Sequence, residues 1–399
     1  MLIEVAIASI IAFVIGILTG LTPGIHNNTI TAILITLIPS LSLNPLTLIV
    51  FVVVLALTHT ILDFIPSIFT GATDGESFMA TLPGHDMLNE GRGVEAVAAT
   101  ALGAKIAIPI IIAVTPIFVV TVPLLIETFK KIIPFILLFV SFYSIFREKY
   151  IHTAMSVWLL SGFLGYASLN LPIKEPLLPL LSGLFGGSGL VLSIMQKTKI
   201  PKQKNMRKIK FEKKEIVKAT IGAAISAPLC SFLPAIGSGH AAAIGSELTH
   251  QSRRGFLIML GAINTIVMTL SFATLYAIGK TRTGAAAAIQ EIVKTPTIKD
   301  LTIIVFVAIA TIILSSFITT VLSRFFARKI NKIKYHLVSA AMLAVLLVVL
   351  IAFTNFLGII VFITGTALGI FTTQSNIRKI NLMGCLMIPT IIYYVNVPP

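Results

Sequence analysis

Long runs without a single charged side chain make up most of this chain, and short segments rich in lysine and arginine separate them. About 20 consecutive apolar residues suffice for an α-helix to cross the hydrocarbon core of a bilayer. The pattern therefore predicts an all-α polytopic membrane protein with about 10–12 transmembrane or re-entrant helices. The uncharged runs comprise residues 5–62, 106–126, 151–173, 176–196, 219–246, 255–279, 301–323 and 337–377.

Composition narrows the class of protein further. The 399 residues are 56% hydrophobic and 11% charged, whereas a soluble globular domain is about 25% charged. Together with a mean hydropathy of +0.99, this composition excludes an ordinary soluble domain. The two cysteines, Cys230 and Cys385, lie far apart inside apolar runs, which indicates buried bystanders rather than a disulfide or metal framework.

The net charge of +15 raises the question of a nucleic-acid partner. The basic residues are instead concentrated in short loops between apolar runs, and such loops stay in the cytoplasm under the positive-inside rule. We therefore predict a multi-pass protein of the cell membrane, without a nucleic-acid partner, whose cytoplasmic loops are 197–214, 324–334 and 378–380. An even number of crossings must separate these loops, which holds if the broken stretch 219–246 is re-entrant.

The strongest shift in polarity along the chain falls at the basic stretch 197–214. This stretch has the composition of a cytoplasmic linker between two membrane-embedded parts. We therefore expect a first membrane half at residues 1–196 and a second membrane half at residues 215–399, joined by the linker 197–214.

The two halves share a pattern of helix-breaking and polar segments. In each half a break rich in proline and glycine is followed by a polar tip, and the tips begin at Gly71 and Gly279, 48 and 45 positions after Pro23 and Pro234. Two weak matches in the same order at nearly the same spacing indicate an internal duplication. Many secondary transporters consist of inverted repeats that hold the substrate at paired broken helices. We therefore expect two structural repeats, inverted, with a substrate site between the breaks.

The breaks themselves suggest how an anion would be held. Pro23 removes a backbone donor and Gly24 permits unusual dihedral angles, so a helix entering from residue 5 should end near residue 22. The helix after this break would present free amide groups and the positive end of its dipole. Both are suited to bind a carboxylate or a phosphate. A kink or tight helix packing is the alternative interpretation. The predicted substrate-binding residues are Thr22, Pro23, Gly24, His26, Asn27, Asn28 and Thr29 in the first break and Pro234, Gly237, Ser238, Gly239 and His240 in the second.

The polar tips differ in charge between the halves, because the first contains acids and the second contains Lys280 and Arg282. Ionisable groups at membrane depth are costly and usually functional, and arginine suits bidentate contact with a carboxylate. A loop at the membrane surface would carry the same charges at no cost, which is the alternative. The substrate contacts predicted from the tips are Asp74, Glu76, Ser77, Thr281, Arg282 and Thr283.

Asp63 lies late in an apolar run, one turn after His59. A carboxylate in such a position could bind Na⁺ or carry a proton, although near the end of a span it could equally be hydrated. We predict Asp63 and Asp74 as ion-coupling residues, with Na⁺ or H⁺ as the coupling ion. No other cofactor and no metal site is predicted, because Glu247 and His250 lack a third ligand and favour an interfacial pair.

Several short motifs along the chain are also found together in one transporter family. They are the break Pro23-Gly24, the segment Asp63-Phe-Ile-Pro-Ser-Ile-Phe, the run Thr81 to Ala96 with Gly91, Arg92 and Glu95 near its end, and Leu233-Pro-Ala-Ile-Gly-Ser-Gly239. At these residues the chain resembles the TctA family, the large membrane subunit of tripartite tricarboxylate transporters, and particularly its compact archaeal branch. The resemblance implies transport of an organic anion driven by an ion gradient. It also implies an extracytoplasmic binding protein and a small membrane subunit as partners.

Three functions follow from these features. The leading interpretation is an ion-coupled secondary transporter, not an enzyme, that holds a small carboxylate-type anion between the two breaks while the tips close over it. Translocation of a lipid-linked phosphate is the alternative, because it would also use paired breaks and a basic clamp. An intramembrane metal-dependent enzyme is a third possibility, although its candidate ligands His26, His85, Asp86 and His240 are dispersed along the sequence.

Overall fold

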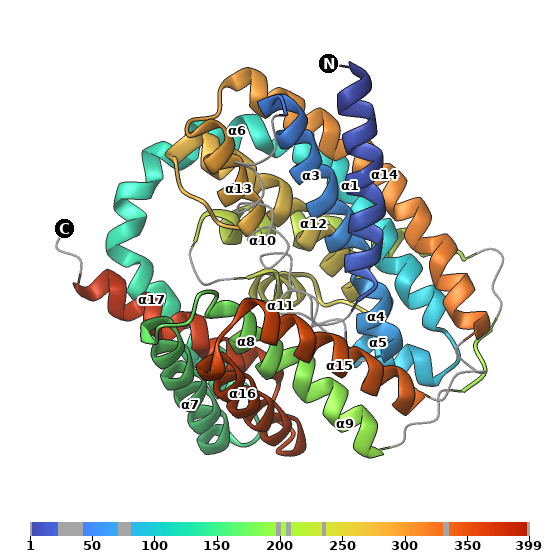
Figure 1. Ribbon diagram of the computed structural model, residues 1–399, viewed down its shortest axis with the longest axis vertical. Coiled ribbons are helices and arrows are strands. Elements are labelled where there is room, and N and C mark those ends of the chain that lie inside the picture. The colour runs from blue at the N-terminus through green and yellow to red at the C-terminus, as the bar shows by residue number, and fades with distance from the viewer. Residues whose placement is uncertain are drawn as a thin grey trace.

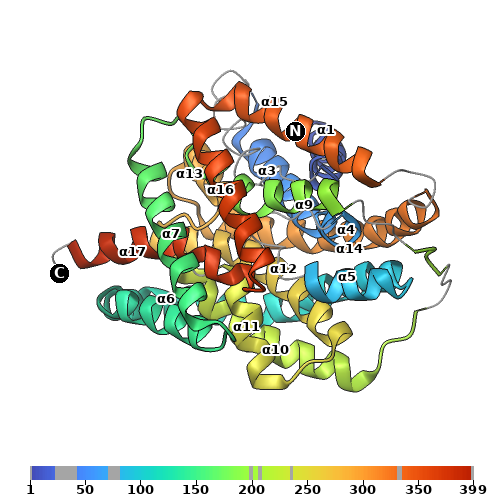
Figure 2. The ribbon, with the colours of Figure 1, turned by 90° about the horizontal axis from the view of Figure 1, so that it is seen from below.

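The protein folds into a bundle of helices (Figure 1). The computed structural model describes residues 2–22, 43–70, 81–196, 201–204, 209–233, 237–329 and 335–396. Within these residues every regular element is a helix, which confirms the predicted all-α class. The second of the two views shows the same bundle from below, with α12 in the interior and α17 projecting at the edge (Figure 2).

The first half begins with a long apolar helix and ends in a helix run that contains one π-helical turn. The longest element, α6, stays helical over 54 residues although it contains four prolines. The elements are α1 (Leu2–Gly20), α3 (Pro45–Leu62), α4 (Phe64–Thr70), α5 (Thr81–Asn89), α6 (Gly93–Phe146), α7 (Ile151–Asn170), α8 (Leu177–Leu181), the π-helix η3 (Ser182–Gly187) and α9 (Ser188–Gln196).

The second half also combines long and short helices and ends in a 3₁₀ helix followed by α17. Its elements are α10 (Lys213–Phe232), α11 (Ser238–Thr249), α12 (Arg253–Ile278), α13 (Gly284–Val293), α14 (Ile298–Lys329), α15 (Tyr335–Phe353), α16 (Phe356–Gln374), the 3₁₀ helix η5 (Lys379–Met383) and α17 (Gly384–Asn396).

Nine helices or helix runs in the described part of the chain are long and apolar enough to cross a membrane. Their outward faces are apolar: on α6, for example, Ile117, Val120 and Leu124 are 63%, 66% and 75% exposed. Large contiguous apolar surface of this kind is rare on soluble proteins and suits contact with lipid. The candidate spanning segments, by length and composition, are 2–20, 45–69, 93–126, 177–195, 213–232, 253–278, 298–329, 336–353 and 356–374.

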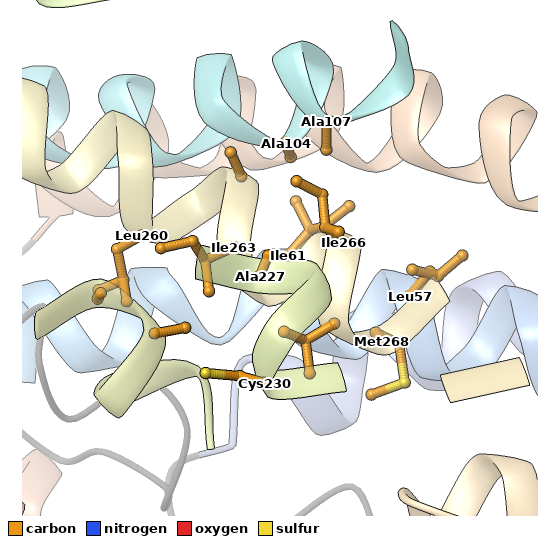
Figure 3. Close-up of a cluster of buried hydrophobic side chains, with 14 of the residues drawn as sticks. Leu57, Ile61, Ala104, Ala107, Ala227, Cys230, Leu260, Ile263, Ile266 and Met268 are labelled. Carbon is orange, nitrogen blue, oxygen red and sulfur yellow. The ribbon is translucent and has the colours of Figure 1, made fainter. Parts of the chain in front are cut away.

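One helix from each half forms the centre of the bundle. In the spanning segments of α3 with α4, and of α12, 94% of the residues are buried, compared with 17% in α1 and in α15. Figure 3 shows Leu57 and Ile61 of α3 in one cluster with Ile263 and Ile266 of α12, together with side chains of α6 and α10. The centre of the protein is therefore built from both halves.

The halves interlock instead of packing side by side. The first-half helix α3 packs on the second-half helices α14 and α13, and the second-half helix α12 packs on the first-half helices α6 and α5. The hydroxyl of Ser315 on α14 lies 3.2 Å from that of Thr58 on α3. Separating the halves would therefore expose both central helices, which makes a division into two independent folding units physically implausible. The boundaries 1–196, 197–214 and 215–399 remain predictions.

The described part of the linker, residues 201–204, is docked on the turn between α5 and α6. Lys204 donates its backbone N–H to the Gly91 carbonyl over 2.8 Å. The Gln203 side chain accepts the N–H of Gly93 at 2.9 Å and donates to the Leu88 carbonyl at 3.0 Å, so it satisfies the first turn of α6. Gly91 has a φ of +77°, a conformation that glycine adopts without steric cost.

The crossing of α6 and α12 depends on two glycines. A Cβ atom on Gly103 would lie 1.9 Å from the carbonyl oxygen of Ile258, and one on Gly261 would lie 2.2 Å from that of Thr100. Small residues let membrane helices approach to backbone contact, where dispersion replaces the hydrophobic effect that is missing between lipid-solvated helices. These two positions therefore let the backbones of α6 and α12 come into contact.

Replacing Gly103 by alanine is expected to destabilise the protein by about 1–3 kcal/mol, because the added methyl group forces the two backbones apart. Unfolding by a denaturing detergent in mixed micelles measures this change. Gly365→Ala is the matched control, since its added Cβ would meet its nearest atom at 3.2 Å. Equal destabilisation by both variants would contradict the assigned role of the α6–α12 crossing.

Candidate functional site

The second break lies at the tip of a helical hairpin. α10 runs into the bundle and α11 returns beside it, so that the ammonium of Lys218 near the start of α10 donates to the carbonyl of His250 after α11, over 3.2 Å. A Cβ on Gly222 would likewise lie 3.1 Å from the Thr249 hydroxyl. The chain therefore returns to the face from which α10 started, as the re-entrant interpretation of residues 219–246 predicts.

The sequence explains why the hairpin turns where it does. Leu233 ends α10 in an extended conformation, with φ −81° and ψ 125°, and this is the conformation that a following proline favours in the residue before it. Pro234 itself lies outside the described residues. α11 then begins after Gly237, which has no side chain with which to cap it. The first turn of α11 thus presents its amide end without a side-chain cap, the feature that attracts anions at helix N-termini.

The second polar tip meets this break. Arg282, in the loop between α12 and α13, donates from Nη1 to the carbonyl oxygen of Leu233 at the end of α10. The two segments predicted as one site from their spacing are therefore in contact within the second half.

The other predicted residues of the second break are buried. Ser238 and His240 are 1% and 2% exposed, and Gly239 is buried as well. Nδ1 of His240 is buried and has no hydrogen-bond partner among the residues that the structure describes. A buried polar atom without a partner costs free energy, so this nitrogen is suited to meet a group supplied by a bound molecule.

The threonines of the second tip have different environments. Thr283 caps α13 by accepting the Ala286 N–H at 3.2 Å, and its hydroxyl lies 2.9 Å from that of Ser271. Its side chain therefore has a structural role that the sequence analysis did not foresee. Thr281 is exposed. Gly279 ends α12 with a φ of +64° and lets the loop fold back along the helix.

The first break and the first tip lie largely outside the described residues. Thr22 is described and donates its hydroxyl to the Leu18 carbonyl over 2.8 Å, so that α1 ends just before it. The remaining predicted residues of the first half that fall outside the described part are Pro23, Gly24, His26, Asn27, Asn28, Thr29, Asp74, Glu76 and Ser77.

Asp63 lies inside a continuous span. It joins α3 to α4, with its N–H bonded to the His59 carbonyl at 2.9 Å and its carbonyl accepting the Ser67 N–H at 3.1 Å. The residue is 5% exposed and lies within the spanning segment Pro45–Phe69. A carboxylate in this position is costly unless its charge is compensated, so ionisable groups there usually serve function.

An ion-pair network joins the two halves near the start of α6. Glu95 receives both arms of Arg92, at 2.8 Å each, and a third contact at 3.2 Å from Arg254 of α12. Arg254 also contacts Glu215 of α10 at 3.0 Å. The side chain of Glu95 is 4% exposed, so the network ties the first turns of α6, α10 and α12 together in a largely buried setting.

Exposed charges continue the network toward solvent. Glu90 accepts from Arg253 at 2.7 Å and from Arg92 at 3.0 Å. Hydrogen bonds from these two guanidinium groups, Arg253 first, hold the pKa of Glu90 below its ordinary value. The pKa of a carboxylate falls in this way when neighbouring cations favour its charged form.

The groups considered as metal ligands do not assemble in the described part of the chain. Among those residues no three His, Cys, Asp or Glu side chains come close enough to hold one ion. Glu247 pairs with Arg147 instead, and His250 ends α11 with a φ of +47°. His85 and Asp86 lie on the helix α5.

Sequence reasoning missed one element that adjoins the break. A Cβ atom added to Gly237 would lie 3.3 Å from Cε of Met383 in η5. η5 therefore lies against the start of α11. Charge alone had assigned 378–380 to a cytoplasmic loop. Within the structure Arg378 pairs with Glu148 at 2.7 Å and Lys379 reaches the π-helix, and no signal in the local sequence reports these long-range contacts.

Known proteins resemble the chain over nearly its whole length. The family model described as "Tripartite tricarboxylate transporter TctA family" matches residues 7–384. An uncharacterized protein of Methanocaldococcus jannaschii is 29% identical over 400 residues, which cover 96% of this chain and 98% of the relative. No solved structure matches the chain. The family match includes both breaks, both polar tips and η5.

Proposed function

Because this chain belongs to the tripartite tricarboxylate transporter TctA family, we propose that it moves a small carboxylate-type anion across the cell membrane as an ion-coupled secondary transporter. Membership confirms the resemblance inferred from the short motifs, and it identifies a multi-pass membrane subunit of a tricarboxylate-type transport system. The observation that carries the proposal is the contact between Arg282 and the broken end of α10. It brings a guanidinium to the uncapped start of α11, and both suit a carboxylate.

The proposed site spans two inverted repeats. In the first half α1 runs parallel to α3. Glu4 contacts Asn44 and Thr19 contacts His59, and in both pairs the residues are 40 positions apart in the sequence. In the second half α10 runs parallel to α12. The contacting residues, such as Glu215 and Ser252, are 37 to 43 positions apart in the sequence. This common geometry supports a duplication of the whole break-containing unit.

The directions of the helices support inversion. The first half of α3 shares a hydrophobic cluster with the start of α14, and later along both helices Thr58 contacts Ser315. The two helices therefore run in the same direction. α12 begins at Arg253 and α14 ends in Arg328 and Lys329. The positive-inside rule puts both of these ends in the cytoplasm. α3 therefore runs opposite to α12, as inverted repeats require.

By this symmetry the first break would face the second. Residues Thr22 to Thr29 and the acidic tip with Asp74, Glu76 and Ser77 complete the proposed site from the first half, opposite Pro234 to His240 and the loop with Thr281 and Arg282. Movement of one repeat against the other would then expose the anion to alternate sides. The loops 197–214, 324–334 and 378–380 face the cytoplasm in this arrangement.

The system would have further components. An extracytoplasmic binding protein and a small membrane subunit are the partners that the family description "tripartite" implies, and we propose both for this chain. The coupling ion is Na⁺ or H⁺, carried with the participation of Asp63 and Asp74.

The Asp63→Asn variant should separate coupling from binding. Removal of the negative charge without a change of shape is expected to lower the gradient-driven accumulation of the anion to the level reached without a gradient, because the variant cannot bind the coupling cation. Anion exchange across the same proteoliposomes, which needs no coupling ion gradient, should persist. Accumulation equal to that of the wild type would show that Asp63 has no part in coupling.

Counterflow in proteoliposomes tests the function itself. Vesicles containing the purified full-length protein are loaded with an unlabelled carboxylate, and entry of the labelled compound is followed for monocarboxylates, dicarboxylates and tricarboxylates. Entry above that of empty vesicles is expected for at least one of them. If none enters, with or without candidate binding protein and small subunit, the chain is not a carboxylate transporter.

A further inference from the structure

The first turn of α11 contains one titratable side chain, that of His240. It is the third residue of the helix, after Ser238 and Gly239, and its backbone N–H bonds back to the carbonyl of Gly237 at 3.1 Å. The side chain is 2% exposed. An imidazole is therefore held out of bulk water at the helix end where the proposed anion binds.

The ring of His240 lacks the partner that a buried histidine normally has. Its Nδ1 is buried and forms no hydrogen bond with any residue of the described structure. An unsatisfied buried polar atom costs free energy, and most such atoms in native proteins have a partner. A carboxylate bound at the end of α11 would supply one, because it can accept N–H groups from the helix and from the ring together.

The elements packed against α11 provide the ring with no counter-charge. α10 and α12 pack along α11, and η5 meets its start through Met383 and Gly237. The titratable or charged groups near this end of α10 and α12 and in η5 are Cys230, Tyr276, Lys280, Arg282, Arg378 and Lys379.

The carboxylates of α11, of α10 and beside η5 are already paired. They form the pairs Glu247–Arg147, Glu215–Arg254 and Glu148–Arg378. Glu215 and Glu247 lie at the opposite end of the hairpin, where Lys218 meets the carbonyl of His250. In the described part of these elements, no unpaired carboxylate is left to stabilise a charged imidazole.

The charge of the ring should therefore follow the anion. Without an anion, a protonated His240 would add a positive charge to a buried setting that already contains cations, which is costly. A bound carboxylate reverses this balance, because a nearby negative charge favours the charged form of histidine. The ring then takes up a proton from water as the anion binds, and Nδ1–H donates to the carboxylate in a charge-assisted hydrogen bond. Proton and anion leave together on the other side.

We propose that His240 takes up a coupling proton when the anion binds, so that a proton gradient drives transport through a group in contact with the substrate. The proposal rests on the proposed function, and it adds a proton site at the substrate to Asp63 and Asp74. A proton carried with a carboxylate also cancels the charge that a membrane potential would oppose. In the alternative, the ring stays neutral, donates from Nδ1 and brings no proton with the anion.

The number of protons taken up on binding distinguishes these alternatives. Calorimetric titration of the purified full-length protein with tricarballylate, repeated in two buffers of different ionisation enthalpy, measures this number. At about pH 7, where histidine titrates, we expect about one proton fewer for His240→Gln than for the wild type. Glutamine keeps a side-chain donor but cannot become charged, and protonation of the ligand itself is common to both proteins.

The matched control is His152→Gln, the same substitution at an exposed position of α7. It should take up as many protons as the wild type. The affinity should show the same difference, because binding that takes up a proton weakens as the pH rises, by up to ~10-fold per pH unit between about pH 6 and about pH 8. His240→Gln should lose this dependence and His152→Gln should retain it. Protonation of the ligand acts in the opposite sense, since it tightens binding as the pH rises.

The outcomes separate the coupling role from the proposed function. Equal proton uptake by the wild type and His240→Gln, or none by either, overturns the role of His240, whereas the proposed function stands if the anion still binds. Weaker binding by His240→Gln with unchanged proton uptake makes His240 a neutral ligand and also overturns the proposal. Should His240→Gln fail to fold, His240→Asn replaces it, because it makes the same change of charge.

The wild type decides whether there is a carboxylate to couple. If it binds no tricarballylate, the carboxylate that enters in counterflow is titrated in its place. If no carboxylate enters, the proposed function fails and the coupling role of His240 fails with it.

Discussion

Substitution of Arg282 by methionine should lower anion binding and counterflow at least ~30-fold, the loss expected when one partner of a buried, hydrogen-bonded charge pair is removed. Arg282 is a predicted site residue that the fold brings to a broken helix end, through its bond to the Leu233 carbonyl. Loss of the guanidinium removes the proposed carboxylate partner, and it also frees the loop between α12 and α13 from α10. Both effects lower anion binding and counterflow.

Two further variants distinguish charge from geometry. Arg282→Lys keeps the positive charge but not the planar fork that can bond a carbonyl and a carboxylate together, so partial activity is expected. Lys294→Met removes a charge from an exposed position at the end of α13 and should transport normally. The measurement is initial counterflow in proteoliposomes at matched protein density. Activity of Arg282→Met equal to that of the control would remove the loop from the site.

Glu95→Ala is expected to cause the largest loss of stability. The substitution leaves Arg92 and Arg254 without the carboxylate that both contact, and breaking a buried ion pair by removal of one partner costs about 3–5 kcal/mol. The partially exposed arginines, at 30% and 22%, favour the lower part of this range. Unfolding by a denaturing detergent in mixed micelles measures the change.

Glu90→Ala is the matched control for this network. It removes a carboxylate from the same two-turn region and from the same Arg92, but the Glu90 side chain is 42% exposed. Exposed ion pairs contribute little to stability because water screens them, so only a small change is expected. If Glu95→Ala were as mild as Glu90→Ala, the network would not hold the starts of α6, α10 and α12 together.

Much of the fold follows from local sequence. Charge-free runs of sufficient length predict spanning helices, and the basic loops predict which ends share a side. The second break was predictable in detail, since Pro234 forces Leu233 out of the helical region and Gly237 leaves the next helix uncapped. The similar spacing of break and tip in the two halves predicted a duplication, whereas the contact of Arg282 with Leu233 comes from the fold.

Other features depend on partners far along the chain. Four prolines inside α6 would each weaken an isolated helix, yet the helix continues, because neighbouring membrane helices can satisfy the freed backbone groups. Thr283 is used as a helix cap rather than left open to a ligand. The contacts of η5 were not predicted, because charge counting along the sequence does not report which distant elements a segment packs against. Only the fold brings Met383 to Gly237 and Lys379 to Phe185.

The central claim is that an anion is held where the start of α11 meets Arg282. A cryo-electron microscopy structure of the full-length protein in lipid nanodiscs with tricarballylate present tests it most directly. We expect density for the anion in contact with the Arg282 guanidinium and the first amides of α11. Anion density bound elsewhere, with these groups closed upon one another as in the free protein, would contradict the claim.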